Sequence, residues 1–235
     1  WLGRVVENFL DDEVKLVYAD WLSDQSDKRG DFLRQYATAL NTMNADEFPD
    51  ATGLPEPWLD LIGFRIASGL AKAGRGELKE LLFRLARPAL RFKRSDRKDK
   101  SIPIGGSKIG GQPDLPADMP WPQGQQCAAI YNDDTQGVTA PACFIAQINL
   151  AEIADTFAAS VMPDQGVLSV FCYQDLEEDN PDQIGVGAFL LPAPDQLTRR
   201  QSPQELVYGN KEMPAKLLEF EQTLDLPNGY DGPWS

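Results

Sequence analysis

The fold of this chain turns on the stretch Gly105-Gly106-Ser107-Lys108-Ile109-Gly110-Gly111-Gln112-Pro113-Asp114-Leu115-Pro116. It contains four glycines and two prolines in twelve residues. Glycine permits positive φ and close approach of another backbone, whereas proline fixes one torsion and pushes the residue before it toward extended geometry. Such a stretch is neither a helix nor a central strand. It predicts an ordered loop whose shape is set by its backbone restrictions.

Strand-like runs follow this loop. Apolar and β-branched residues predict strands at Cys143–Asn149, Gly166–Tyr173, Gly185–Leu191, Glu205–Tyr208 and Leu217–Leu224. A short helix is expected at Ala151–Ser160. Before the loop, a strand at Ala89–Phe92 is expected to lead into a charged loop at Lys93–Lys100.

Helical patterns occupy the first third of the chain. Apolar residues recur at helical spacing over 11–24 and 29–43, which predicts a helical hairpin joined by a polar turn. A third helix is expected over Trp58–Leu70, loosened by Gly63 and Gly69, and a fourth over Glu77–Ala86 with a stripe of leucines. Helices first and mostly antiparallel strands afterwards indicate an α+β fold.

Composition excludes several kinds of chemistry. The 235 residues include no histidine, which removes the commonest general base and the commonest transition-metal ligand. We therefore expect no catalytic residue, no cofactor and no metal site. No apolar run approaches the roughly 18 residues of a membrane helix. The three cysteines (Cys127, Cys143 and Cys172) form no CxxC pair, which fits a reducing cytoplasm.

The net charge of −14 is unevenly distributed. Residues 84–100 hold eight basic and two acidic residues, whereas residues 151–235 hold four basic and fifteen acidic ones. The acidic majority argues against nucleic-acid binding, which needs a net basic face. Three functions are considered: binding of a protein, binding or conversion of a small ligand, and binding of nucleic acid. Nucleic-acid binding through the basic stretch at 84–100 is the weakest of these hypotheses. An acidic protein instead suits a basic protein partner, because complementary charge accelerates encounter.

The glycine-rich loop also suggests a ligand site. It is not a P-loop, because Ser107 precedes Lys108 and Gln112-Pro113 stands where a helix should begin. The amides of two loop glycines and the nearby lysine could still form an anion-binding nest. Gln147 and Asn149 lie on one side of a predicted strand. Their side chains could either form hydrogen bonds with the backbone of the loop or line a cleft beside it. The candidate ligand-binding residues are Lys108, Gly110, Gly111, Asp114, Trp121, Gln147 and Asn149.

Two sequence blocks resemble a known family. The run SKIGGQPDLPADMPWP at Ser107–Pro122, followed by Phe144–Leu150 and Pro163–Phe171, resembles the YwqG-like family of uncharacterised bacterial proteins. That family has no established activity, although some relatives look like members of toxin–immunity gene sets. The resemblance begins near Arg87. It implies that the domain continues past Ser235, so that this chain would carry a truncated form.

The N-terminal part resembles a second module. Tyr18-Ala19-Asp20-Trp21-Leu22 followed by Arg29-Gly30-Asp31-Phe32-Leu33-Arg34 is similar to the repeat-companion domain, a short helical module of bacterial proteins whose role is unknown. We therefore expect a repeat-companion-like module at 1–48, a linker with helices at 49–86 and a YwqG-like β-rich domain at 87–235.

The favoured function is a non-catalytic module that binds another protein, with an immunity-like role allowed by the resemblance. The alternative is an enzyme, or a protein that binds a small molecule or anion, using a cleft beside the glycine-rich loop.

Overall fold

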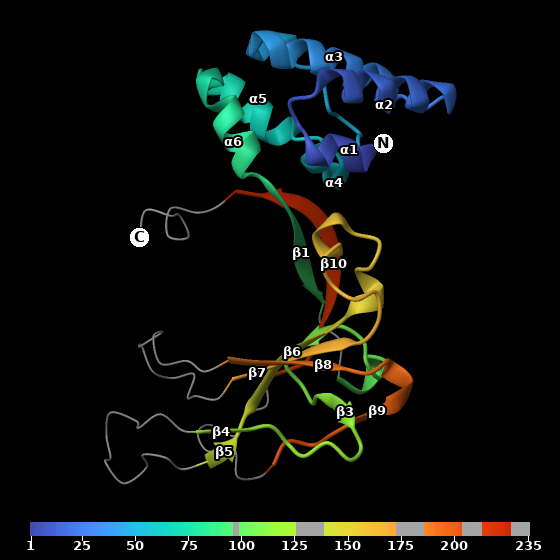
Figure 1. The fold of residues 1–235 in the computed structure, drawn as a ribbon, viewed down its shortest axis with the longest axis vertical. Helices are drawn as coiled ribbons and strands as arrows, with labels where there is room; N and C mark the ends of the chain where they lie inside the picture. The colour runs from blue at the N-terminus through green and yellow to red at the C-terminus, as the bar shows by residue number, and fades with distance from the viewer. Residues whose placement is uncertain (96–98, 126–138, 173–185, 204–212, 227–235) are drawn as a thin grey trace, which may run out of the picture. The chain divides into compact units, whose positions relative to one another are not determined.

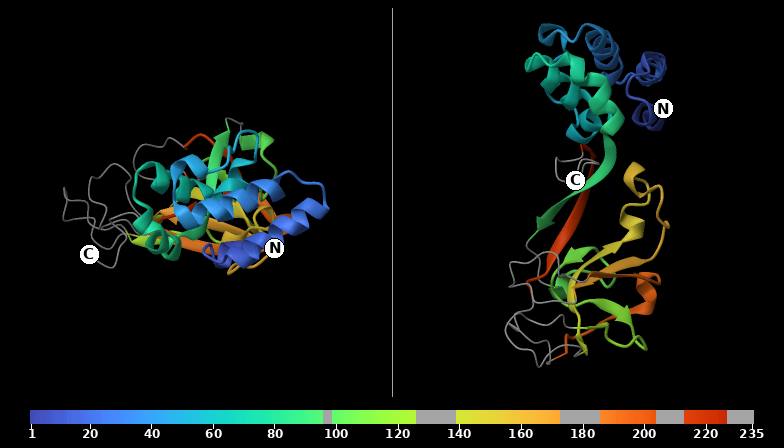
Figure 2. Two further views of the ribbon diagram at one scale, coloured as in Figure 1. Left: turned by 90° about the horizontal axis from the view of Figure 1, so that it is seen from above. Right: turned by 60° about the vertical axis from the view of Figure 1, so that its left-hand side comes forward.

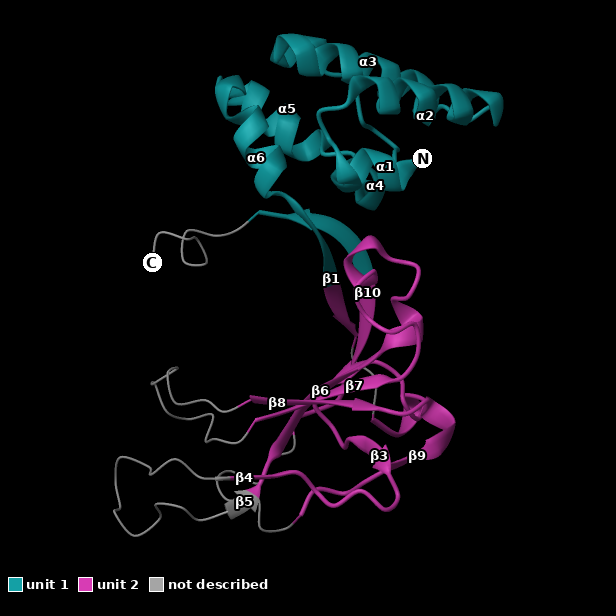
Figure 3. Cartoon of the chain, in the orientation of Figure 1, with its two compact units in different colours: residues 1–91, 221–235 teal, residues 92–220 magenta. Residues whose placement is uncertain are grey.

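The chain forms two compact units. The computed structural model describes residues 1–95, 99–125, 139–172, 186–203 and 213–226 (Figure 1). Unit 1 comprises Trp1–Arg91 with Glu221–Ser235, and unit 2 comprises Phe92–Phe220 (Figure 3). Helices come first and mostly antiparallel strands follow, which confirms the α+β class. Among the described residues, no helix is long and apolar enough to cross a membrane.

Unit 1 is built from short helices. Its described residues form α1 (Leu2–Glu7), α2 (Asp12–Asp24), α3 (Arg29–Thr42), α4 (Glu56–Leu61), α5 (Phe64–Lys72) and α6 (Lys79–Leu85), with the 3-10 helices η1 (Ala45–Glu47) and η2 (Gly76–Leu78). The bounds of α2 and α3 agree with the periodicity of the sequence to within one residue. These two helices form the expected hairpin and lie side by side (Figures 1 and 2).

Local chemistry explains where α2 begins and how closely α3 approaches it. The side chain of Asp11 caps α2 by accepting a hydrogen bond from the amide of Val14 at 3.1 Å. At the start of α3, a Cβ added to Gly30 would lie 2.7 Å from the carbonyl oxygen of Ala19 and 2.3 Å from Oγ of Ser23. Glycine is therefore required at the point where the two helices come closest.

Aromatic rings fill the centre of unit 1. The contacting pairs have ring centroids between 5.1 and 6.5 Å apart. This is the range in which offset and edge-to-face contacts stabilise a core. Four of the rings lie on α3, α4 and α5, and the fifth belongs to the residue that follows η1. The five residues are Phe32, Tyr36, Phe48, Trp58 and Phe64.

Two expectations for the later helices are wrong. Residues 58–70 form two helices instead of one, because Gly63 adopts a left-handed φ of 76° between α4 and α5. A Cβ there would lie 2.6 Å from the ring of Phe83, so no other residue fits. Gly69, in contrast, lies within α5 without interrupting it. In α6 the buried side chain is Phe83, whereas Leu81 of the expected leucine stripe is 53% exposed.

The strands form one six-stranded sheet and two small ribbons. The order in the large sheet is β1 (Arg87–Ser95), β10 (Lys216–Asp225), β2 (Lys108–Ile109), β6 (Cys143–Asn149), β7 (Val167–Cys172) and β8 (Val186–Leu191). The ribbons pair β3 (Asp114–Pro116) with β9 (Leu197–Arg199) and β4 (Gln123–Gln125) with β5 (Thr139–Pro141). Each pairing from β10 to β8 is antiparallel.

A second apolar core lies in unit 2. Its centre is Phe171 on β7, whose ring meets those of Trp121, Phe144 and Phe189 edge-on at 5.9, 5.5 and 5.7 Å. The buried members of this core are Leu115, Trp121, Ala142, Phe144, Val167, Phe171, Leu191 and Leu197.

The expected strands at 89–92, 143–149, 166–173, 185–191 and 217–224 correspond to β1, β6, β7, β8 and β10. Three other local predictions are wrong. Inside the predicted loop at 105–116, Lys108–Ile109 is β2, an interior strand of the six-stranded sheet, and Asp114–Pro116 is β3. Lys93–Ser95 belongs to β1 instead of a loop, and residues 151–160 form the 3-10 helices η5 (Leu150–Glu152) and η6 (Phe157–Ala159). The expected strand at 205–208 lies outside the described residues.

Candidate functional site

The glycine-rich loop has little freedom in its sequence. Gly110 and Gly111 hold left-handed φ angles of 69° and 70°. A Cβ at Gly110 would lie 2.7 Å from the carbonyl oxygen of Met213, and one at Gly111 would lie 2.7 Å from Cβ of Ala215. Their amides donate to the carbonyl oxygens of Ile145 at 2.7 Å and Met213 at 2.6 Å. Both amides of the proposed anion nest are therefore already satisfied within the chain.

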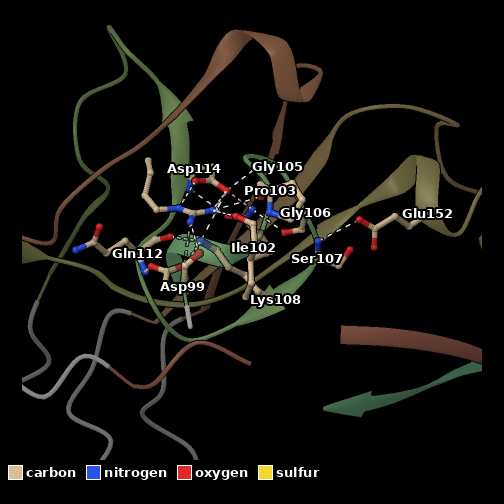
Figure 4. A network of polar contacts seen from close by, with 12 residues as sticks. Asp99, Ile102, Pro103, Gly105, Gly106, Ser107, Lys108, Gln112, Asp114 and Glu152 are labelled. Carbon is tan, nitrogen blue, oxygen red and sulfur yellow. Dashed lines mark hydrogen bonds and ion pairs between the residues drawn. The ribbon is translucent and has the colours of Figure 1, made fainter. Parts of the chain in front are cut away.

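Asp114, the first residue of β3, is the centre of a buried polar network (Figure 4). Its side chain is inaccessible to solvent. Its carboxylate accepts hydrogen bonds from the amide of Gly105 at 2.8 Å and from Nε2 of Gln147 at 2.7 Å. Arg199 adds a bond from Nε at 2.9 Å and one from Nη2 at 3.2 Å. A buried carboxylate with this many donors is a stable internal anion.

Lys108 on β2 lies in the same network and is also fully buried. Its Nζ donates to Oδ1 of Asp99 at 2.9 Å and to the carbonyl oxygen of Gln112, and it lies 3.7 Å from Oδ2 of Asp114. Burial lowers the pKa of this amine below its ordinary value, and the neighbouring carboxylates oppose that shift. The amine is therefore directed at internal acceptors and has no exposed surface to offer a ligand.

Two residues that sequence reasoning missed complete the network. Arg199, at the end of β9, donates to the carbonyl oxygens of Asp99, of Ile102 at 3.1 Å and of Pro103 at 3.3 Å. Asp99 in turn accepts from the amide of Gln112 at 2.8 Å. In the sequence, the one feature that could have drawn attention to Arg199 is the adjacent pair Arg199-Arg200 in a strongly acidic part of the chain.

Arg200 reinforces the same region from the outside. Its amide donates to the carbonyl oxygen of Pro113 at 2.9 Å, and its guanidinium donates to the carbonyl oxygens of Pro116 at 3.3 Å and Met119 at 3.1 Å. The two arginines therefore hold both sides of the loop and of β3 through backbone carbonyls, whose positions the loop's glycines and prolines restrict.

The four charged side chains of the network balance one another. Lys108 and Arg199 supply two positive charges, and Asp99 and Asp114 supply two negative ones. Burial alone would raise the pKa of Asp114, but the hydrogen bonds from Arg199 and the charge of Lys108 outweigh it and hold the pKa below its ordinary value. The network is therefore ionised and close to neutral overall.

Gln147 joins the network to the sheet. It stands opposite Lys108 in the β2–β6 register. Its Oε1 accepts from the amide of Asp114 at 3.0 Å, and its Nε2 donates to the carbonyl oxygen of Gly106 at 2.9 Å as well as to the Asp114 carboxylate. Its amide group thus satisfies the backbone of the glycine-rich loop, which is the structural one of the two roles considered above.

Trp121 and Asn149 have structural roles outside this network. Trp121 packs in the core of unit 2 and donates from Nε1 to the carbonyl oxygen of Ala142 at 2.9 Å. The side chain of Asn149 accepts from the amide of Ala151 at 3.1 Å and caps η5, while its own amide donates to Oγ of Ser107 at 2.8 Å. Of the seven predicted residues, the structure brings together Lys108, Asp114 and Gln147, with the two glycines forming the adjoining loop.

The network is built to hold segments of chain together. Its donors and acceptors join η3 (Asp99–Ser101), the glycine-rich loop, β3, β6 and β9. Within the residues that the structure describes, no group of three or more Cys, Asp or Glu side chains could hold a metal ion.

Comparison with known proteins identifies one relationship. No curated protein matches the chain. A protein-family model matches residues 107–224, which is about half of the chain and runs from the glycine-rich loop to β10. The matched region contains Lys108, Asp114, Gln147 and Arg199. Asp99 lies just before it. The chain therefore belongs to the family described as a domain of unknown function, DUF1963.

Proposed function

We propose that this protein is a non-catalytic module that binds another protein. The observation that carries the proposal is the saturation of the network: Lys108, Asp114 and Gln147 are fully buried and bonded within the chain. A ligand could reach them only by displacing charge-assisted hydrogen bonds, each of which stabilises by about 1.5–3 kcal/mol. The absence of histidine from the sequence supports the same conclusion.

In this proposal the network is a brace. It fixes the glycine-rich loop and β3 in one geometry, so that the outer surface of unit 2 has a defined shape. Preorganised surfaces bind more tightly because less conformational entropy is lost on association. The partner would be basic, since the chain carries a net charge of −14.

The finer family relationships are part of the proposal. We assign 87–235 to a YwqG-like domain and 1–48 to a repeat-companion-like module, with helices at 49–86 between them. The repeat-companion-like assignment is supported by contacts of its motif residues, which join α3 to α2. The guanidinium of Arg34 donates to the carboxylate of Asp20 at 2.8 Å and to Oγ of Ser23 at 3.0 Å. An immunity-like role and a cytoplasmic location follow from these resemblances and from the pattern of cysteines.

Affinity capture with the tagged full chain tests the proposal. A lysate of the source cell would be divided between about 50 mM and about 500 mM salt, because exposed charge pairs are largely screened at the higher concentration. We expect a basic protein to be retained at low salt and released at high salt. Failure to enrich any protein at low salt would contradict the proposed function.

A ligand site beside the glycine-rich loop is the competing hypothesis, and thermal shift measurements separate the two. Nucleotides, sugars and metal ions would be tested against the full chain. A ligand at 100 times its dissociation constant stabilises the folded state by about 2.7 kcal/mol. A shift of that size that disappears in Lys108→Met would favour the ligand site over the protein-binding function.

A further inference from the structure

The solvent-facing side of α2 carries apolar and acidic side chains together. Leu16, Val17 and Trp21 are 44%, 37% and 48% exposed, and Glu13 and Asp24 are exposed as well. Residues three, four, seven or eight positions apart share one side of a helix. These five residues therefore form one surface, which we call the α2 face.

The α2 face has no positive charge of its own. The only basic residue in α2 is Lys15, which points away from this face and is fully buried. Its Nζ pairs with Oδ1 of Asp12 at 3.2 Å. Burial of the one cation of α2 leaves Glu13 and Asp24 without a basic neighbour on their own helix, whereas Asp20 between them is paired with Arg34 of α3.

The carboxylate of Asp24 has no role in stabilising the fold. Asp24 is the last residue of α2, and a helix C-terminus carries a partial negative charge that disfavours an acid. Within the described residues, neither Asp24 nor Glu13 takes part in an ion pair. Asp20, on the same helix, is in contrast paired with Arg34 at 2.8 Å. The uncompensated charge on the α2 face is thus available to a partner.

Trp21 is held in place although half of it is exposed. Its ring stacks on that of Tyr18, with centroids 6.1 Å apart. The hydroxyl of Tyr18 in turn accepts a hydrogen bond from Nε1 of Trp58 at 3.2 Å in the buried core. A preorganised, partly exposed tryptophan is typical of the side chains that dominate binding energy in protein interfaces.

We propose that the α2 face is a docking surface for a basic segment of another protein that also carries apolar side chains. Apolar groups of the partner would cover Leu16, Val17 and Trp21, and its Lys or Arg side chains would meet Glu13 and Asp24. Charge complementarity selects this partner over an acidic or purely apolar one. The inference rests on the proposed function and adds a docking surface on unit 1 to the braced surface of unit 2.

A synthetic probe tests the assignment on the full chain. The probe is a fluorescent amphipathic peptide of lysine and leucine, about 18 residues long so that a helix can form. Its binding would be followed by fluorescence anisotropy. We expect Trp21→Ala and the double variant Glu13→Lys/Asp24→Lys each to weaken binding by about tenfold or more. A polylysine of equal charge should bind more weakly than the probe.

A matched variant controls for net charge. Glu7→Lys/Asp46→Lys changes the charge of the chain by the same amount at exposed residues elsewhere in unit 1. It should change the affinity by less than about twofold, because neither residue belongs to the α2 face and salt weakens charges that do not contact the partner. Circular dichroism would verify that each variant folds. Leu16→Ser/Val17→Ser, which alters exposed side chains only, provides a second test should Trp21→Ala fail to fold.

The outcomes separate the inference from the proposed function. Equal binding of the probe by all variants and the wild type would overturn the α2 face and leave the proposed function standing. Equal weakening in the matched charge control would also overturn it, because net charge alone would then explain binding. Self-association of the wild type that is lost in Trp21→Ala would make a second copy the occupant and overturn the basic partner. No binding of the probe to the wild type would overturn the α2 face, whereas the proposed function is tested separately by affinity capture.

Discussion

Among the residues that the structure describes, each unit buries one lysine, and the two lysines are buried in different ways. Lys15 in unit 1 has a single carboxylate partner, Asp12, whose side chain is 37% exposed. Lys108 in unit 2 has two carboxylates and a backbone carbonyl within a closed network. In both cases burial lowers the pKa of the amine. The difference shows that the buried lysine of unit 1 has a local partner three residues away, whereas that of unit 2 belongs to paired charges that join distant segments.

The largest expected effect comes from removing the central anion of unit 2. Asp114→Asn leaves Lys108 and Arg199 with one carboxylate between them in a buried site, so we expect a loss of about 3–5 kcal/mol in the free energy of unfolding. Asp12→Asn leaves the buried amine of Lys15 with a neutral acceptor, so it should cost about 1–3 kcal/mol, less than Asp114→Asn. Urea unfolding followed by fluorescence measures both values. Equal losses in the two variants would remove the distinction between the units.

Replacing each lysine by an apolar side chain sharpens the comparison. Lys108→Met removes charged hydrogen bonds to Asp99 and Gln112, and we expect it to destabilise by about 1.5–3 kcal/mol. Lys15→Met should be neutral or stabilising, because an apolar side chain of similar volume avoids the cost of burying a charge. Hydrogen exchange of residues 99–116 would locate the effect of Lys108→Met. Strong destabilisation by Lys15→Met would show that unit 1 also relies on its ion pair.

Steric fit between α2 and α3 also stabilises unit 1. Gly30→Ala places a methyl group 2.7 Å from the carbonyl oxygen of Ala19, so α2 and α3 must move apart, at a cost of about 1–3 kcal/mol. Gly69→Ala is the control, since among the described residues no heavy atom lies within 4 Å of a Cβ at that position. It should stabilise by about 0.5–1 kcal/mol, the usual gain from replacing a helical glycine. Thermal unfolding would rank the two variants, and destabilisation by both would contradict this account.

The smallest effect is expected in acid. The pKa of Asp114 is held below its ordinary value, so the folded state binds fewer protons than the unfolded state between the two pKa values. The stabilisation from Asp114 is complete above the unfolded pKa of about 3.9 and is lost as the pH falls through the lower folded value. Stability of the wild type should therefore fall more steeply below about pH 4 than that of Asp114→Asn. Identical slopes would show that folding does not lower the pKa of Asp114.

Local patterns predicted most of the elements but not every boundary. The helices at 12–24 and 29–42 and the strand at 143–149 follow from side-chain periodicity, which depends only on neighbouring residues. The break at Gly63 depends on the ring of Phe83, twenty residues later in the chain. Nothing in the residues around Gly63 identifies that contact, so the sequence alone predicted one helix where there are two.

The sequence by itself determined the class of fold, although the stretch 105–116 that it predicted as a loop contains β2 and β3. It also singled out Lys108, Asp114 and Gln147. Only the tertiary structure decided what those residues do. Arg199 reaches Asp114 across 85 residues and Asp99 across 100, and no local rule connects positions so far apart. A buried charge must find its partners wherever the folded chain brings them. For that reason a pattern that suggested a ligand site became an internal brace once Arg199 and Asp99 were in place.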